Sequence, residues 1–103
     1  MAYDLNVTEL AHEDLSNIIS YMAVELSNKP AAVHFIGEVE KCYDRLKENP
    51  LIYEECRDPR LKMEGYRKIA IHHYVLVYKV NEPAKAVIIY RFFYGRQDYT
   101  KLI

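Results

Sequence analysis

Several residue types are scarce in this sequence, and each shortage excludes a class of protein. The 103 residues include no Trp, 2 Cys, 3 Gly and 4 Pro. So few Gly and Pro argue against a disordered or low-complexity chain. Cys42 and Cys56 form no C-x-x-C pair and have no Cys/His cluster beside them, so we expect Cys42 to be a buried structural thiol.

Long apolar runs are also missing. None approaches the ~20 residues that a membrane-spanning helix needs. The first ten residues, MAYDLNVTEL, have neither the basic region nor the apolar region of a secretory signal. We therefore expect a cytoplasmic protein with no membrane partner.

What is present fits one soluble domain spanning 1–103. Half of the residues are hydrophobic and 28% are charged, which is typical of a globular protein of this length. The chain has 10 Tyr, whose rings supply apolar area and whose hydroxyls need a partner. Such an excess suits strands and interfaces.

The net charge of −1 conceals a strong asymmetry. Residues 1–56 hold 4 Lys/Arg and 11 Asp/Glu, a balance of −7, whereas residues 57–103 hold 10 and 4, a balance of +6. The basic half favours an anionic partner, either nucleic acid or an acidic protein segment. The alternative is that both charges serve only solubility.

The first half of the chain predicts a short strand and two amphipathic helices. The alternation in 3–8 predicts the strand, and Thr8 is a good N-cap for the first helix. Pro30 suits the first turn of the second helix, and Asn49-Pro50 ends it. The two helices form an antiparallel hairpin with apolar stripes that need a sheet to cover.

The second half predicts three strands after a polar connection. The connection, 51–65, is long for a compact domain, so we expect it to be mobile or functional. The runs 65–71, 74–80 and 86–94 are rich in β-forming residues and are joined by short turns, which predicts antiparallel pairing. Because the last two runs are apolar on both faces, we expect them to be central. The fold class is therefore α+β with the order β-α-α-β-β-β.

Common catalytic motifs are missing. His12 and His34 fall on different helices, and the neighbouring His72 and His73 point apart, so we expect no metal site and no cofactor. The serines of the first helix lack the glycines of a nucleophile elbow, and the chain has no glycine-rich phosphate loop.

Cations and phenols on the predicted sheet are the remaining candidates. They are Arg67, Lys68, Arg91, Tyr94, Arg96 and Tyr99, with Asp98 and Glu64 nearby. A guanidinium in mid-strand must be paired or must face a groove. One interpretation is a structural salt bridge, for example to Asp98 or Glu64; the other is a phosphate clamp for metal-free RNA cleavage, with a Tyr moving the proton.

Three segments of the second half resemble a known family. The runs GYRKI (65–69), YVLVYKV (74–80) and IIYRFFYGRQD (88–98), with both helix sequences before them, are similar to the RelE/ParE superfamily of bacterial toxins. The resemblance covers nearly the whole chain. It implies a helical hairpin packed on a small, mainly antiparallel, twisted sheet. It also implies the toxin of a type II toxin–antitoxin, or plasmid stabilisation, module, which inhibits growth until a cognate antitoxin neutralises it.

The resemblance leaves the molecular target open. RelE-like members cut mRNA on the ribosome without metal, and ParE-like members inhibit DNA gyrase. The nucleases commonly have His or Lys where this chain has Tyr94 and are strongly basic, so the ParE branch is favoured. A third alternative is a non-toxic relative that only binds antitoxin.

The resemblance also implies site residues and partners. If the chain is a nuclease, the candidate catalytic residues are Arg67, Arg91, Arg96, Tyr94 and Tyr99. The candidate partner-binding residues are Arg67, Lys68, Arg91, Tyr94, Arg96, Asp98 and Tyr99. The expected partners are an antitoxin and either gyrase or the ribosome with mRNA, and operator DNA is reached only through the antitoxin.

Overall fold

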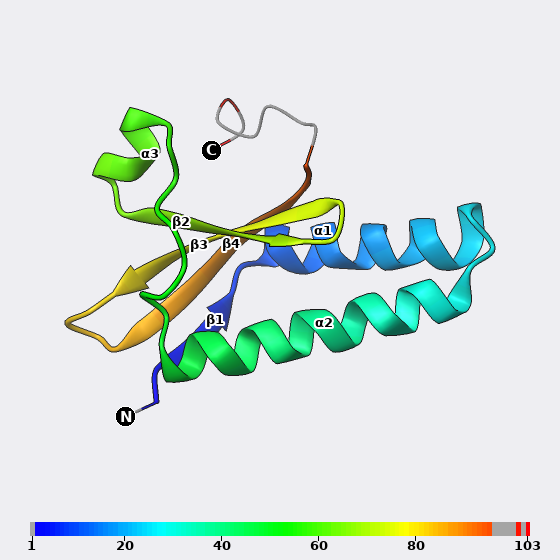
Figure 1. Ribbon diagram of the computed structural model, residues 1–103, viewed down its shortest axis with the longest axis horizontal. Helices are drawn as coiled ribbons and strands as arrows, with labels where there is room; N and C mark the ends of the chain where they lie inside the picture. The colour runs from blue at the N-terminus through cyan, green and yellow to red at the C-terminus, as the bar shows by residue number, and fades with distance from the viewer. Residues whose placement is uncertain (1, 96–100, 102) are drawn as a thin grey trace.

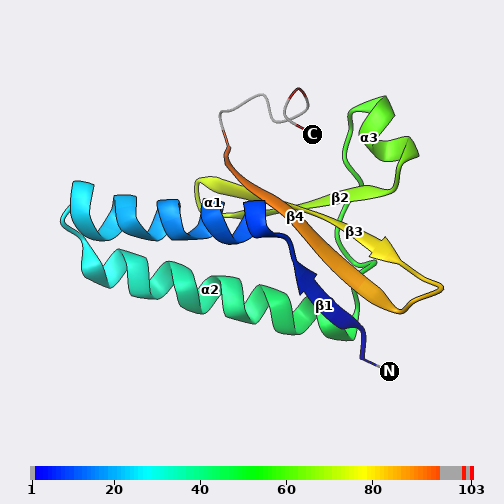
Figure 2. The ribbon, with the colours of Figure 1, turned by 180° about the vertical axis from the view of Figure 1, so that it is seen from behind.

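A four-stranded sheet with a helical hairpin on one face forms the molecule, as a computed structural model shows (Figure 1). The structure describes residues 2–95, 101 and 103. The strand order is β1-β4-β3-β2. Seen from behind, the hairpin lies on one side of the sheet, and the short helix α3 (Pro59–Met63) lies on the other (Figure 2). The expected α+β class and element order are confirmed.

Both long helices begin where the sequence predicts. Thr8 caps α1 (Glu9–Ser20) by accepting a hydrogen bond from the Ala11 amide at 3.1 Å. The helix continues as a π-helical turn, η1 (Tyr21–Glu25). Asn28 caps α2 (Lys29–Glu48) in the same way, and Pro30 lies in its first turn. The expected helical hairpin is therefore present.

Three antiparallel strands and one parallel strand make the sheet. β2 (Tyr66–Ile71) pairs with β3 (Tyr74–Asn81), and β3 pairs with β4 (Ala86–Tyr94), both antiparallel. β1 (Asp4–Val7) runs parallel to β4 along the other edge. The two strands predicted to be central, β3 and β4, are central. Both strands are buried on the inner face, and Val77 and Phe93 are buried on the outer face as well, in keeping with their nearly continuous apolar sequence.

The two faces of the sheet have different roles. The inner face packs against the hairpin and contributes to the main core, which includes Ile69, Leu76, Tyr78, Val87, Ile89 and Phe92 together with the apolar stripes of α1 and α2. The outer face packs in part against α3. Its smaller core consists of Cys56, Leu61, Tyr66, Val77 and Phe93, with Val75, Tyr90 and Ile103 at its border.

A β-bulge in β4 rearranges the outer face. The pairing of β3 with β4 shifts by one residue, so that Val77 lies opposite Arg91 while Tyr78 lies opposite Ile89. The extra residue is Tyr90, and both Tyr90 and Arg91 line one pocket on the outer face. The bulge therefore places two consecutive side chains on the same side of the sheet, which simple alternation does not predict.

The connection between α2 and β2 is more ordered than the sequence predicted. It contains α3, which begins at Asp58: the Asp58 carboxylate accepts hydrogen bonds from the amides of Arg60 and Leu61. A bridge between Glu55 and Arg67 also ties the connection to β2. The expectation of a mobile or functional connection did not include this short helix, although its signal, an Asp-Pro N-cap, is present in the sequence.

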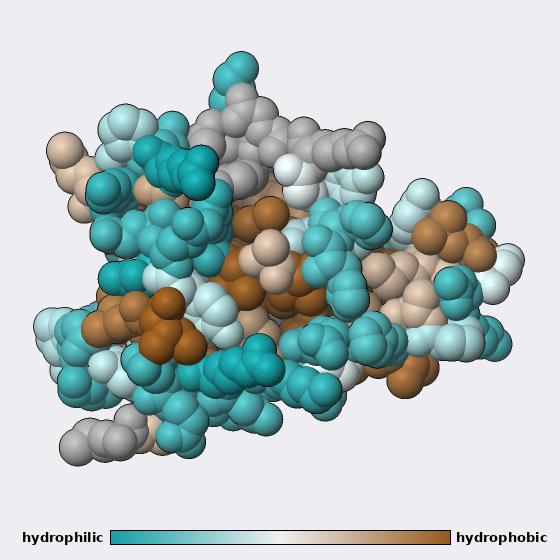
Figure 3. Space-filling view, in the orientation of Figure 1, coloured by the Kyte–Doolittle hydropathy of each residue, from teal (hydrophilic) through white to brown (hydrophobic). Residues whose placement is uncertain are grey.

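Exposed apolar side chains gather at the far end of the hairpin, which extends past the sheet (Figures 1 and 3). Tyr21, Val24, Leu26 and Val33 are each about half exposed or more. No helix within the described part of the chain is both long and apolar enough to span a bilayer.

Candidate functional site

The outer face carries cations among tyrosine rings. Tyr66 and Lys79 lie directly opposite each other on β2 and β3, and the Lys79 ammonium is 5.1 Å from the centre of the Tyr66 ring. On the other side, the Tyr66 ring meets the Tyr90 ring edge to face, with their centres 5.0 Å apart. Lys68, two residues after Tyr66, lies on the same face. We call Tyr66, Lys68, Lys79, Tyr90 and Arg91 the outer-face site.

Two hollows flank Tyr90 within this site. One, of about 370 Å³, is lined mainly by apolar atoms from Leu10, Tyr66, Tyr90 and Ile103. The other, of about 460 Å³, lies between Tyr90 and the β3–β4 turn and is lined by Lys79 and Ile88 among others. A surface with apolar hollows and cations beside them is suited to an amphipathic segment that carries acidic groups.

The guanidinium of Arg91 forms an ion pair with an aspartate of the same chain. Its Nε donates to Asp14 Oδ2 at 2.7 Å and its Nη2 donates to Asp14 Oδ1 at 3.0 Å. The same Oδ2 accepts from the Phe92 amide at 3.0 Å, so Asp14 on α1 binds both the side chain and the backbone at the bulge. These hydrogen bonds raise the pKa of Arg91. The structural salt bridge that the sequence offered as one interpretation exists for Arg91, and Asp14 is its partner.

Arg67 also binds the chain itself, on the opposite face of the sheet. It lies across from Tyr78, an inner-face residue. Its Nη1 donates to the carbonyl of Tyr53 at 2.6 Å and to that of Leu51 at 3.5 Å. Because these carbonyls follow the end of α2, Arg67 fixes the start of the connection to the edge of the sheet. Its guanidinium does not reach the outer-face site.

The predicted site residues are therefore divided between two surfaces. Lys68 and Arg91 lie on the outer face, whereas Arg67 lies on the inner side. Tyr94 pairs with Tyr74, and the two rings meet at 5.7 Å near Phe35 of α2, so Tyr94 also lies on the inner side. Arg96, Asp98 and Tyr99 lie outside the described residues. The four candidate residues within the described part of the chain therefore do not lie in one cluster.

Burial makes two of the tyrosines, Tyr66 and Tyr74, poor groups for proton transfer. Loss of solvent, followed by the nearby Tyr90, raises the pKa of Tyr66 in the outer-face site. Burial likewise raises the pKa of Tyr74 beside Tyr94. A tyrosine that removes a proton near neutral pH needs a lowered pKa, because the ordinary value is already ~10. These two tyrosines are better suited to packing and hydrogen bonding.

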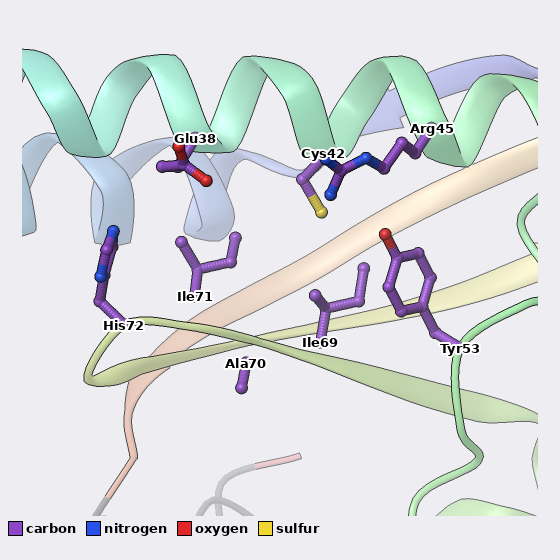
Figure 4. Close-up of a pocket in the computed structure, with 8 residues that line it drawn as sticks. All are labelled: Glu38, Cys42, Arg45, Tyr53, Ile69, Ala70, Ile71 and His72. Atoms are coloured by element: carbon purple, nitrogen blue, oxygen red, sulfur yellow. The ribbon is translucent and has the colours of Figure 1, made fainter.

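A third cavity, of about 190 Å³, lies between α2 and the C-terminal half of the edge strand β2 (Figure 4). Glu38, Cys42 and Arg45 face it from α2, and Ile69, Ile71 and His72 face it from β2 and its turn. Cys42 is 3% exposed, and burial raises the pKa of its thiol to about 11. The expectation of a buried structural thiol agrees with this position, since a reactive cysteine needs an accessible thiolate.

Sequence reasoning missed Tyr66, Lys79, Tyr90 and Asp14. Tyr66 and Lys79 share a face because the two-residue turn at His72-His73 fixes the register of β2 against β3. That signal is present in the sequence. The placement of Tyr90 beside Arg91 depends on the bulge, and the partnership of Asp14 with Arg91 spans 77 residues. Neither can be read from local patterns.

Comparisons with known proteins agree on the fold. The model of the family described as "ParE toxin of type II toxin-antitoxin system, parDE" matches residues 5–99. No curated protein matches the sequence significantly. Among solved structures, a chain of the chromosomal ParDE system from P. aeruginosa is 18% identical, with a TM-score of 0.70 over 90% of this chain and 96% of its own.

Two RelE-type structures are similar to a comparable degree. A mutant of the E. coli toxin RelE in the free state is 21% identical, with a TM-score of 0.66 over 99% of this chain and 93% of its own. A chain of the toxin-antitoxin complex RelBE2 from Mycobacterium tuberculosis is 20% identical, with a TM-score of 0.63 over 91% and 99%. At these identities the likeness concerns the fold.

Proposed function

The chain belongs to the ParE toxin family of type II toxin–antitoxin systems, and from that membership we propose that it arrests growth by binding and inhibiting DNA gyrase. In this proposal the protein is not an enzyme. It acts by occupying a surface of its target, and a cognate antitoxin prevents this by covering the toxin.

The observation that carries the proposal is the pairing of both mid-strand arginines. A metal-free nuclease of this kind would need cationic groups to stabilise charge on the scissile phosphate. Arg91 is held by a bidentate pair with Asp14, and Arg67 donates to two backbone carbonyls. Releasing Arg91 for a phosphate would leave the Asp14 carboxylate, 16% exposed, without its partner. Protein binding makes no such demand.

Inhibition of purified gyrase tests the proposal. The chain, freed from antitoxin, should abolish supercoiling of relaxed plasmid by gyrase, and addition of the antitoxin should restore it. Relaxation by a type I topoisomerase is the matched control and should be unaffected. Full supercoiling at a saturating concentration of folded toxin would exclude this function.

One observation favours a second candidate, a ribosome-dependent mRNA endonuclease. Lys68 and Lys79 remain on the outer face beside the Tyr66 and Tyr90 rings, and such a combination suits single-stranded RNA. Mapping mRNA 5′ ends after induction distinguishes the two functions: cuts at ribosomal A sites support the nuclease, and intact mRNA with growth arrest supports gyrase inhibition. No growth arrest at all would support the non-toxic relative.

For the antitoxin we propose the outer-face site as the docking surface. An acidic amphipathic segment can place apolar side chains in the hollows beside Tyr90 and carboxylates near Lys68 and Lys79. Opposite charges accelerate association and make it sensitive to salt. The simplest test is to examine the reading frame next to this gene, which should encode a small acidic protein.

Charge reversal then locates the surface. Lys79→Glu should lower the association rate with antitoxin about tenfold at low salt. The matched control is Lys41→Glu on the exposed side of α2, which makes the same charge change away from the site. An equal loss for both variants, or an association rate that does not change with salt, would contradict this assignment.

A further inference from the structure

Two histidines that are far apart in the sequence meet at the seam between the hairpin and the sheet. His34 lies on α2, and His72 lies in the turn between β2 and β3. Their ring centres are 5.2 Å apart, and the ring planes are tilted by 53°. Figure 4 shows the His72 ring pointing from the turn towards α2. The proposed toxin function uses neither side chain.

The separation of the rings matches that of two imidazoles on one metal ion. A tetrahedral ion binds imidazole nitrogen at ~2.0–2.1 Å, which places the centres of two such rings roughly 5 Å apart. The rings are tilted and not stacked, so rotation about the Cβ–Cγ bonds can turn a nitrogen of each towards the space between them. We propose that His34 and His72 together bind a divalent transition-metal ion that fastens α2 to the β2–β3 turn.

The groups around the pair are compatible with a cation. Glu38, one helical turn after His34, places Oε1 3.9 Å from His34 Nε2, and it also lines the cavity shared with His72. A carboxylate beside a ligating imidazole orients the ring and adds negative charge. Two cations of the same helix are also close: the Lys41 ammonium lies 3.7 Å from the same Glu38 oxygen, and Arg45 lines the cavity.

Space for the remaining ligands is present. The two rings open onto a hollow of about 270 Å³ that Met22, Phe35 and His73 also line. Within the described part of the chain, no three His, Cys, Asp or Glu side chains form a ready metal centre. The chain therefore supplies two ligands and water supplies the others, which makes this an exchangeable site.

The backbone of the turn gives His72 an unusual position. Its φ of 55° lies in the left-handed region, where Gly or Asn is the usual residue. A non-glycine residue in this backbone conformation carries a conformational cost. At this position the His72 ring lies against the ring of His34. The proposal departs from the expectation of no metal site. That expectation considered His72 with its neighbour His73, whereas the fold brings it to His34.

Ion identity follows from the ligands. Imidazole suits Zn²⁺, Ni²⁺ and Cu²⁺, whereas Mg²⁺ and Ca²⁺ prefer oxygen ligands. The protein is prepared without a histidine tag. Saturating Zn²⁺ or Ni²⁺ should then raise its Tm by roughly 5 °C, and Mg²⁺ should leave Tm unchanged. Titration calorimetry should give one ion per chain.

Matched variants identify the ligands. His72→Asn keeps a residue that tolerates the left-handed turn, and His34→Gln keeps a polar residue in the helix; each should abolish the Tm rise. His12→Gln on α1, which lies away from this hollow, should retain it. Circular dichroism confirms that each variant is folded. Absence of a Tm rise in the wild type, or its loss in the His12→Gln control as well, would overturn the proposal.

Discussion

The inner and outer faces of the sheet come from the same strands and use polar groups in opposite ways. On the inner face, the side chains of Arg67 and Tyr78 form hydrogen bonds within the chain: both donate to backbone carbonyls just after the end of α2. On the outer face, Lys68 and Lys79 stay at the surface beside tyrosine rings. Alternation along β2 produces this division, since consecutive residues point to opposite faces.

The difference teaches that an arginine in a strand is not by itself a site. Arg67 and Arg91 look equivalent in the sequence, yet they lie on opposite faces and both are paired. The lysines, which are compact charges on flexible stems, are the cations left for a partner. The following experiments test whether stability belongs to the inner face and binding to the outer one.

The largest effect is expected in the inner core. Leu76→Ala should lower the free energy of unfolding by about 2–5 kcal/mol, because Leu76 is completely buried between the sheet and the hairpin. Ile88→Ala on the half-buried outer side is the control and should cost clearly less. Urea denaturation measures both. Equal losses would show that the faces share the stabilisation.

The next largest effect is expected at the link between the faces. Asp14→Ala should cost about 1–3 kcal/mol, because it removes the acceptor for the Arg91 guanidinium and the Phe92 amide. Glu13→Ala, at the exposed neighbouring position, should change stability by less than about 0.5 kcal/mol. If the two variants unfold at the same urea concentration, Asp14 does not fasten the bulge.

Alkaline pH should lower the stability of the fold through the buried Cys42 thiol on the inner side of the sheet. The folded state holds the Cys42 thiol protonated up to a pKa of about 11, against an ordinary 9.0. Above pH 9 the unfolded chain therefore loses a proton that the folded chain keeps, and stability falls as pH rises. The loss due to Cys42 should be roughly 1 kcal/mol at pH 10. Cys42→Ala should show a shallower decline in Tm between pH 8 and 10 than the wild type.

Two buried phenols should respond with opposite signs. Tyr78 donates to the Pro50 carbonyl at 2.6 Å, so Tyr78→Phe should destabilise by about 1 kcal/mol. The Tyr43 hydroxyl is buried and, within the described part of the chain, has no hydrogen-bond partner. Tyr43→Phe should therefore be neutral or stabilising by up to about 1 kcal/mol. Thermal unfolding of both variants checks the signs, and destabilisation by Tyr43→Phe would indicate an unrecognised partner.

The smallest effect on stability is expected from the outer-face lysines. Lys68→Gln should change the free energy of unfolding by less than about 0.5 kcal/mol, because its Glu54 partner is 3.8 Å away and largely exposed. A marked fall in Tm would mean that the outer face also supports the fold. The same variant should slow antitoxin association, and this places its role in binding.

Local signals predicted much of the fold. Thr8, Pro30 and Asn49-Pro50 marked helix ends that the structure confirms, because capping depends on nearby backbone groups. The unbroken apolar runs correctly indicated β3 and β4 as central strands. The helix α3 was not predicted, although Asp58-Pro59 is a typical start of a helix.

The candidate site was harder to predict, since it depends on long-range register. A one-residue bulge decides that Arg91 lies with Tyr90, and only the packing of α1 on β4 brings Asp14 to it. His34 and His72 meet for the same reason. Each of these pairings joins segments whose sequences contain no sign of the other.

The parallel pairing of β1 with β4 has a consequence for how the chain is made. Leu5 lies beside Val87, so β1 finds its neighbour in the sheet only after the helices and the two strands between them have been synthesised. Until then the hairpin can form, but the inner face that it must cover is missing. Such late closure of a distant contact slows folding and leaves apolar surface open. The growing chain therefore cannot complete its fold before β4 is made, and the outer-face site, which includes Tyr90 and Arg91, is assembled only then.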